Sequence, residues 1–203
     1  MTSGALERVI RKAATRQPQP QQERCELCGE PLADSHRHVL DTRSRELLCA
    51  CYACSVLFNR DEASEGHYRL VPERRVRLDG LSPAALGVPV GLAFFVKRSD
   101  GPVVAHYPSP AGATRWETDP AVWEATAADH PALAGLLPDV EAVLVNTARG
   151  KQDAWLVPID VCYRLVAIVR QTWRGLSGGD RVWPAIERFF EELPSASGSS
   201  ARR

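Results

Sequence analysis

Short apolar runs separated by turn residues recur through the middle of the chain, and this pattern predicts a set of paired strands. The clearest segments are residues 90–97 and 103–107, followed by residues 140–146 and 153–157. The first pair is joined by a turn that contains Asp100 and Gly101, and Asp-Gly between apolar runs is typical of a hairpin. We therefore expect a mainly antiparallel sheet.

A helical period of apolar residues follows toward the C-terminal end. Val161, Leu165, Ile168 and Val169 recur at the spacing of one helix face in residues 158–173, and glycines follow that segment. Asp180 then begins a second helix that ends before residue 194, and residues 119–129 predict a shorter one. Sheet and helices together predict an α+β protein with C-terminal helices.

Changes in composition divide the chain into four predicted parts. Residues 1–22 form a short helix (5–15) and a Pro/Gln linker, and residues 23–60 form a cysteine-containing module with strands at 37–40 and 46–48. Residues 61–194 form the α+β domain, with a strand at 68–78, a helical turn at 81–86 and a break after Pro108. Residues 195–203 are small and polar, which predicts a disordered tail.

Two Cys-x-x-Cys pairs carry the clearest chemistry. Cys25 and Cys28 form the first, and Cys51 and Cys54 repeat the spacing farther along the chain. Two such pairs predict a tetrahedral zinc site that holds the module in a zinc-ribbon or knuckle-like fold. A segment this small has few apolar residues for a core of its own, so the metal would stabilise it.

The choice of ligands and of metal leaves alternatives open. Cys49 lies two residues before Cys51 and could replace it, and His36 and His38 lie between the pairs as alternative ligands. A solvated strand face is the simpler interpretation of the two histidines. Iron also binds four thiolates, so Fe is the alternative cofactor to Zn²⁺, as in rubredoxin or an Fe–S protein. Unliganded cysteines in a loop are the remaining interpretation.

Charge and composition narrow the class of protein. The chain has 203 residues, with 25 Lys and Arg against 25 Asp and Glu. The formal net charge is therefore zero, and the chain has no excess positive charge that would favour binding to nucleic acid. No apolar segment is long enough to cross a bilayer, and we expect a cytoplasmic protein without membrane insertion. Clustered cysteines in that compartment indicate metal rather than disulfides. No catalytic motif stands out, so we predict no catalytic residues and no enzyme.

Several segments resemble an uncharacterised family encoded mainly in actinobacteria, beside genes for the high-affinity NiFe hydrogenase. The similar segments are residues 25–32 (CELCGEPL), 36–41 (HRHVLD), 46–58 (ELLCACYACSVLF), 156–160 (LVPID), 162–165 (CYRL) and 173–179 (WRGLSGG). The resemblance covers residues 22–193, and it implies an accessory role in assembly or operation of that hydrogenase.

The expected function is therefore that of a non-enzymatic accessory or adaptor protein with a structural zinc site. Its expected partner is a protein, which the resemblance implies is a hydrogenase component. An electron carrier with iron in the four-thiolate site is the alternative. A zinc-ribbon regulator that binds nucleic acid is the second alternative, and the zero net charge argues against it.

Overall fold

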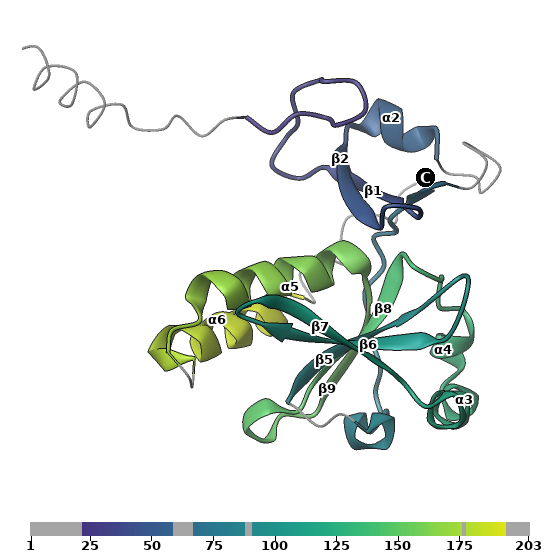
Figure 1. The fold of residues 1–203 in the computed structure, drawn as a ribbon, viewed down its shortest axis with the longest axis vertical. Helices are drawn as coiled ribbons and strands as arrows, with labels where there is room; N and C mark the ends of the chain where they lie inside the picture. The colour runs from purple at the N-terminus through teal and green to yellow at the C-terminus, as the bar shows by residue number, and fades with distance from the viewer. Residues whose placement is uncertain (1–21, 59–66, 88–90, 176–177, 194–203) are drawn as a thin grey trace, which may run out of the picture.

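The fold consists of a small cysteine-containing module above a larger sheet-and-helix body (Figure 1). The computed structural model describes residues 22–58, 67–87, 91–175 and 178–193. The predicted N-terminal helix at 5–15, most of the Pro/Gln linker and the predicted tail lie outside these residues. Within the described part the prediction of an α+β fold with a mainly antiparallel sheet and C-terminal helices is confirmed.

The module is built on a three-stranded antiparallel sheet in the order β2-β1-β3. Strands β1 (Arg37–Asp41) and β2 (Glu46–Ala50) form a hairpin, and β3 (Tyr68–Leu70) pairs with the other edge of β1. The short helix α2 (Tyr52–Val56) follows β2 directly. Strand β3 of this sheet therefore lies beyond residue 60, the last residue of the module as predicted from the sequence. The predicted domain boundaries stay predictions.

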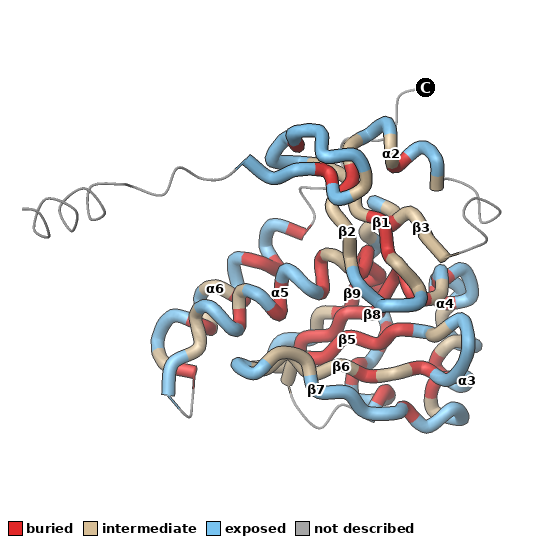
Figure 2. Tube along the Cα trace, turned by 45° about the horizontal axis from the view of Figure 1, so that its top comes forward, coloured by how far each residue is buried: buried red, intermediate tan, exposed pale blue. Residues whose placement is uncertain are grey.

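The larger body contains a six-stranded antiparallel sheet in the order β4-β9-β8-β5-β6-β7. Its strands are β4 (Val76–Arg77), β5 (Leu92–Lys97), β6 (Val103–Ser109), β7 (Gly112–Glu117), β8 (Glu141–Asn146) and β9 (Asp153–Pro158). Every residue of the central strand β8 is buried, because both faces of the sheet are covered. The buried strands form a continuous band through the body (Figure 2).

Helices cover the two faces of this sheet separately. The long helices α5 (Ile159–Thr172) and α6 (Gly179–Glu192) pack on one face, around a core that includes Phe94, Leu165 and Phe189. Helices α3 (Pro120–Asp129) and α4 (Pro131–Ala134) and the 3₁₀ turn Pro83–Leu86 cover the other face, around Phe95 and Trp123. A second 3₁₀ turn, Ala148–Gly150, joins β8 to β9.

Two segments differ from the sequence-based prediction. Residues 68–78 form two short strands in different sheets, because Pro72 has no N–H to continue a ladder. The predicted break after Pro108 is a tight hairpin instead: Ser109 pairs with Gly112, and β7 continues the sheet as an edge strand. Strand β7 has no alternating apolar pattern because its residues are exposed or half-buried, so periodicity could not identify it.

The module is attached to the body by apolar packing and by polar contacts. Leu40 of β1 and Val71 after β3 are buried in the same core cluster as the residues of α5. Arg69 Nη1 donates to the carbonyl oxygen of Pro138 at 2.8 Å. His38 of β1 lies beside Asp160 in the first turn of α5, with 3.0 Å between Nδ1 and Oδ2.

Candidate metal centre

The first cysteine pair lies on a tight turn that precedes the hairpin. The N–H of Gly29 donates to the carbonyl oxygen of Cys25 at 2.7 Å, and the N–H of Cys25 donates to that of Glu30 at 2.8 Å. Gly29 has a φ of 79°, a left-handed conformation that glycine adopts without steric cost. The sequence therefore folds this knuckle locally, and its turn brings Cys25 and Cys28 to one side.

The second cysteine pair lies at the start of α2. Cys51 is the N-cap residue, and its sulfur accepts the N–H of Cys54 at 3.4 Å. The helix continues with Ser55, whose N–H donates to the carbonyl oxygen of Cys51 at 2.9 Å. This pair is thus carried by a helix rather than by a second glycine turn, which agrees with the absence of glycine after Cys54 in the sequence.

The two pairs meet in space. The four sulfur atoms all lie within 4.8 Å of one another, and they belong to Cys25, Cys28, Cys51 and Cys54. The sulfurs of Cys28 and Cys51 are 3.7 Å apart. Four sulfurs placed tetrahedrally around zinc, at about 2.3 Å, are separated by about 3.8 Å. All four cysteines are free rather than disulfide-bonded. The cluster is a candidate metal site that fits zinc or iron; ligation itself stays a prediction.

Cys25 and Cys54 differ in acidity within the cluster. Burial raises the pKa of Cys25, but backbone hydrogen bonds from Cys51, Leu27 and Cys28 outweigh it and lower that pKa to about 6. The pKa of Cys54 is raised to about 12, because its thiol shares hydrogen bonds with Cys28 and Cys51 and lies close to Cys25. Four neighbouring thiolates repel one another, so a bound cation is what allows all of them to ionise.

The alternative ligands named from the sequence lie elsewhere. Cys49, His36 and His38 form a separate group, with one ligand atom from each within 4.8 Å of the others. Among the described residues, none of the three belongs to the four-sulfur cluster. The side chain of His36 is only 9% exposed, so the interpretation as a solvated strand face does not describe it. This His/His/Cys group was not predicted from the sequence. The pairing of β1 with β2 places His38 opposite Cys49, and that pairing could have been counted outward from the turn between the two predicted strands.

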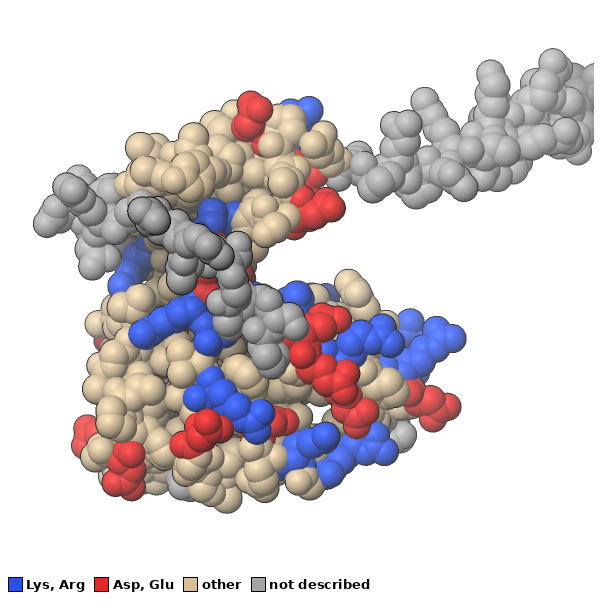
Figure 3. All heavy atoms as spheres, turned by 180° about the vertical axis from the view of Figure 1, so that it is seen from behind, with Lys and Arg blue, Asp and Glu red and all other residues tan. Residues whose placement is uncertain are grey.

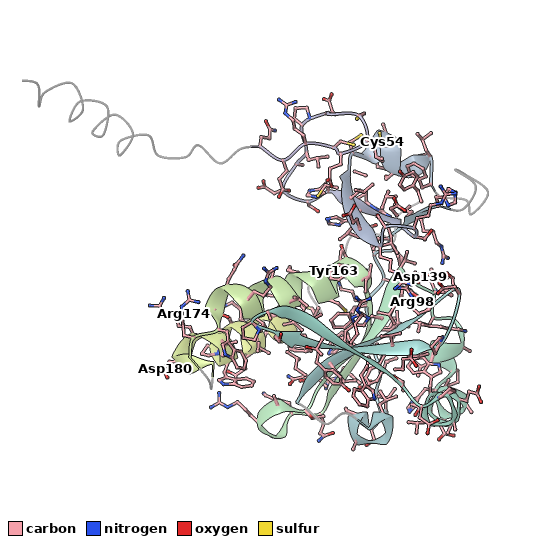
Figure 4. All side chains as sticks on the ribbon, viewed as in Figure 1. Cys54, Arg98, Asp139, Tyr163, Arg174 and Asp180 are labelled. Carbon is pink, nitrogen blue, oxygen red and sulfur yellow. The ribbon has the colours of Figure 1, made fainter. Side chains whose placement is uncertain are left out.

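A cavity of about 360 Å³ lies between the module and the body. Its walls carry Arg45 from the hairpin turn, Arg98 and His106 from the region of β5 and β6, and Tyr163 from α5. Arg98 Nη1 lies 3.2 Å from Asp139 Oδ1, and Figure 4 shows these two side chains together at the foot of the module. Asp139 therefore pairs with one of the arginines that line the cavity.

The sixth cysteine, Cys162, lies outside both groups. Cys162 of α5 is fully buried in the core, and burial raises the pKa of its thiol well above the ordinary value. That position agrees with a packing role rather than a reactive one. Residues 176–177 of the glycine-rich segment before α6 lie outside the described residues. No helix in the described part of the chain has the length and apolar character needed to cross a bilayer.

The fold and the cysteine cluster define the chain as an α+β protein with a candidate metal module. It belongs to a family of unknown function, DUF5947, whose model matches residues 24–197 and so includes both cysteine pairs. No curated protein matches the chain. No solved structure matches it either.

Proposed function

We propose that the protein is a non-enzymatic accessory protein whose four-cysteine module holds a structural zinc ion and contacts a protein partner. The convergence of four sulfurs from a glycine turn and from the start of α2 is the observation that carries this proposal. A four-thiolate set fills every position of tetrahedral zinc and leaves none for a substrate, so the ion would act on folding rather than on chemistry.

The module has few buried apolar residues with which to fold without a metal. Val39, Leu40 and Ala50 are buried in its hairpin, whereas nearly all of the knuckle and helix α2 is exposed or half-buried. Zinc binding contributes on the order of 10 kcal/mol or more in small zinc-dependent modules. This magnitude exceeds what the four buried side chains Leu32, Val39, Leu40 and Ala50 provide, at about 2 kcal/mol or less each.

The exposed surface of the module supports a protein partner. Tyr52 is 77% exposed and Leu57 is 65% exposed, and Val56 lies beside them on the same short helix. Large exposed apolar residues that cluster on one element are typical of an interaction surface. The visible face of the module carries few Lys or Arg side chains, whereas both signs of charge are mixed over the body (Figure 3). A protein surface suits this pattern better than nucleic acid does.

The identity of the partner follows from the resemblance alone. A component of NiFe-hydrogenase assembly is the proposed partner, in the cytoplasm. To test it, the tagged full chain would be mixed with the purified hydrogenase subunits encoded by the same genome. We expect retention of one subunit, and loss of that retention in the Tyr52→Ser/Leu57→Ser variant. Equal retention by Tyr163→Ser, a control at an exposed tyrosine of α5, would locate the contact on the module.

The metal is tested by an elemental assay and a visible spectrum of protein purified without added metal. The proposal predicts a colourless protein that contains zinc, and a zinc content lower by one ion per chain in Cys25→Ser. A red-brown protein with iron in the four-sulfur cluster would overturn the zinc assignment in favour of the electron carrier. Retention on heparin that falls steeply with salt would favour the nucleic-acid regulator instead.

A further inference from the structure

Two histidines and one cysteine converge on the sheet of the module, outside the four-sulfur cluster. Strands β1 and β2 pair so that His38 lies directly opposite Cys49. His36 precedes His38 by two residues, and the ring centroids of the two histidines are 4.8 Å apart with planes tilted by 55°. One ligand atom from each of the three residues lies within 4.8 Å of the others. Ordinary antiparallel pairing therefore assembles a His₂Cys set.

His36 carries a buried nitrogen that has no partner. Its Nδ1 lies 3.0 Å from the carbonyl oxygen of Ala33, which places the ring proton on Nδ1 and a lone pair on Nε2. Its side chain is more than nine-tenths buried, and Nε2 has no hydrogen-bond partner among the described residues. A buried polar atom without a hydrogen-bond partner lowers the stability of the fold. A metal ion at Nε2 would remove that cost.

His38 is oriented in the same way by an acidic side chain. Its Nδ1 lies 3.0 Å from Oδ2 of Asp160, which leaves Nε2 as the free nitrogen. The other oxygen of Asp160 accepts the N–H of Val161 at 2.8 Å, so the carboxylate is itself held in place. A carboxylate or carbonyl behind the imidazole is the usual arrangement of histidines that bind metals, and both histidines have one.

Cys49 is held from the knuckle side. Its N–H donates to Oε2 of Glu26 at 2.6 Å, and its carbonyl oxygen accepts the N–H of Glu26 at 2.9 Å. Glu23 adds a further carboxylate, 3.7 Å from Nδ1 of His36. Three acidic side chains, Glu23, Glu26 and Asp160, therefore surround the set. Their negative charge favours a cation among the three donors.

We propose that His36, His38 and Cys49 form a second metal site, which binds a divalent ion of the zinc class through three side chains and keeps its fourth position open to water. Imidazole and thiolate donors suit zinc, and three protein ligands with an open position are typical of sites where zinc meets an outside ligand. This inference goes beyond the structural zinc of the proposed function, because the second ion could exchange its water for a small anion.

The number of metal ions per chain tests the second site. The full chain would be loaded with Zn²⁺, freed of excess metal and assayed for zinc against protein concentration. We expect two zinc ions per chain in the wild type and one in each of His36→Gln, His38→Gln and Cys49→Ser. His130→Gln, at a histidine outside both clusters, should keep two. One ion in the wild type, or two in all three variants, would overturn the proposal.

The open position has its own readout. Co²⁺ bound by thiolate and imidazole gives visible bands whose energies change when a ligand is added to the metal. Azide should shift these bands in the wild type and in His130→Gln, and should cause no shift in His38→Gln. Absence of a shift in the wild type would show that the fourth position is closed, and would overturn that part of the proposal.

Variants of each site distinguish the two metal sites even if one of them binds no metal. Because Glu26 of the knuckle holds the backbone of Cys49, loss of the first ion in Cys54→Ser should also lower the affinity of the second site. Loss of the second ion in His38→Gln should leave the first ion and its cobalt–thiolate bands unchanged. Retention of the azide response in Cys25→Ser, with no ion in the four-sulfur cluster, would support the second site alone.

Discussion

Nδ1 of His38 and Oδ2 of Asp160 lie 3.0 Å apart, although the two residues are 122 positions apart in the chain. The contact joins strand β1 of the module to the first turn of α5 in the body. It places a carboxylate from one part of the fold behind an imidazole from the other. The position of the module on the body and the orientation of a candidate metal ligand therefore depend on the same pair.

Asp160→Asn should weaken the second metal site and spare the first. The amide keeps an acceptor for Nδ1 of His38 but removes the negative charge, and such changes behind a metal ligand cost about 10–100-fold in affinity. Competition with a chromophoric zinc chelator would measure the change. Asp180→Asn is a matched control, because Asp180 occupies the first turn of α6 and the same helix-dipole contribution is lost there. Equal affinities in the two variants would contradict the role of Asp160.

Removal of the first metal should loosen the module while the body stays folded. Cys54→Ser takes one thiolate from the four-sulfur cluster, so the module loses a binding free energy on the order of 10 kcal/mol. Hydrogen exchange should therefore accelerate in the knuckle and α2, and stay slow in β8, which is buried throughout. Cys49→Ser is the control that should leave exchange in α2 slow. Slow exchange of α2 in Cys54→Ser would show that the module folds without this ion.

Arg74→Met should destabilise the body strongly. Glu141 is fully buried, and its Oε2 accepts a bond from Nη2 of Arg74 at 2.6 Å and from the N–H of Leu137 at 2.8 Å. Removal of Arg74 leaves a buried carboxylate without its cation, which typically costs about 3–5 kcal/mol. Urea unfolding would measure the loss.

The control for that experiment is Arg77→Met. Arg77 pairs at the surface with Asp79, at 3.2 Å, and such pairs contribute less than about 1 kcal/mol. Its loss should lower the unfolding free energy by a correspondingly small amount. Similar losses in both variants would mean that Glu141 is stabilised by its backbone contact rather than by Arg74.

His106 should make the body less stable in mild acid. Burial lowers its pKa from 6.5 to about 4, and the nearby charges of Arg115, Arg98 and Arg45 act in the same direction. The unfolded chain therefore binds this proton first as pH falls below 6.5, and the unfolding free energy decreases until the pH reaches about 4. The loss from this group amounts to about 3 kcal/mol at most, from 1.36 kcal/mol for each pKa unit.

His106→Phe removes this titration and keeps the aromatic stack on Phe94, whose ring lies 4.8 Å away and nearly parallel. Stability measured from pH 7 to pH 4, with each protein at the same metal content, should fall less in the variant than in the wild type. Identical slopes would show that the acid sensitivity comes from the metal ligands alone.

Local patterns were sufficient for most of the secondary structure. The Asp119 cap precedes α3 as expected, with its carboxylate accepting the N–H of Ala121 at 2.9 Å. The hairpin between β5 and β6 and the stripe of α5 were also evident from spacing. Edge strand β7 and the division of residues 68–78 between two sheets were not, because edge strands carry little apolar alternation and pairing partners lie far away in sequence.

The sequence by itself determined the knuckle at Cys25 and Cys28, since a turn with glycine after the second cysteine depends only on neighbouring residues. Which cysteine joined which group was decided by the tertiary structure. The register of the hairpin sets Cys49 opposite His38, and the start of α2 turns Cys51 toward the knuckle instead. A one-residue change of register would send these side chains to opposite faces. The carboxylate behind His38 comes from α5, and only packing of the module on the body brings it there.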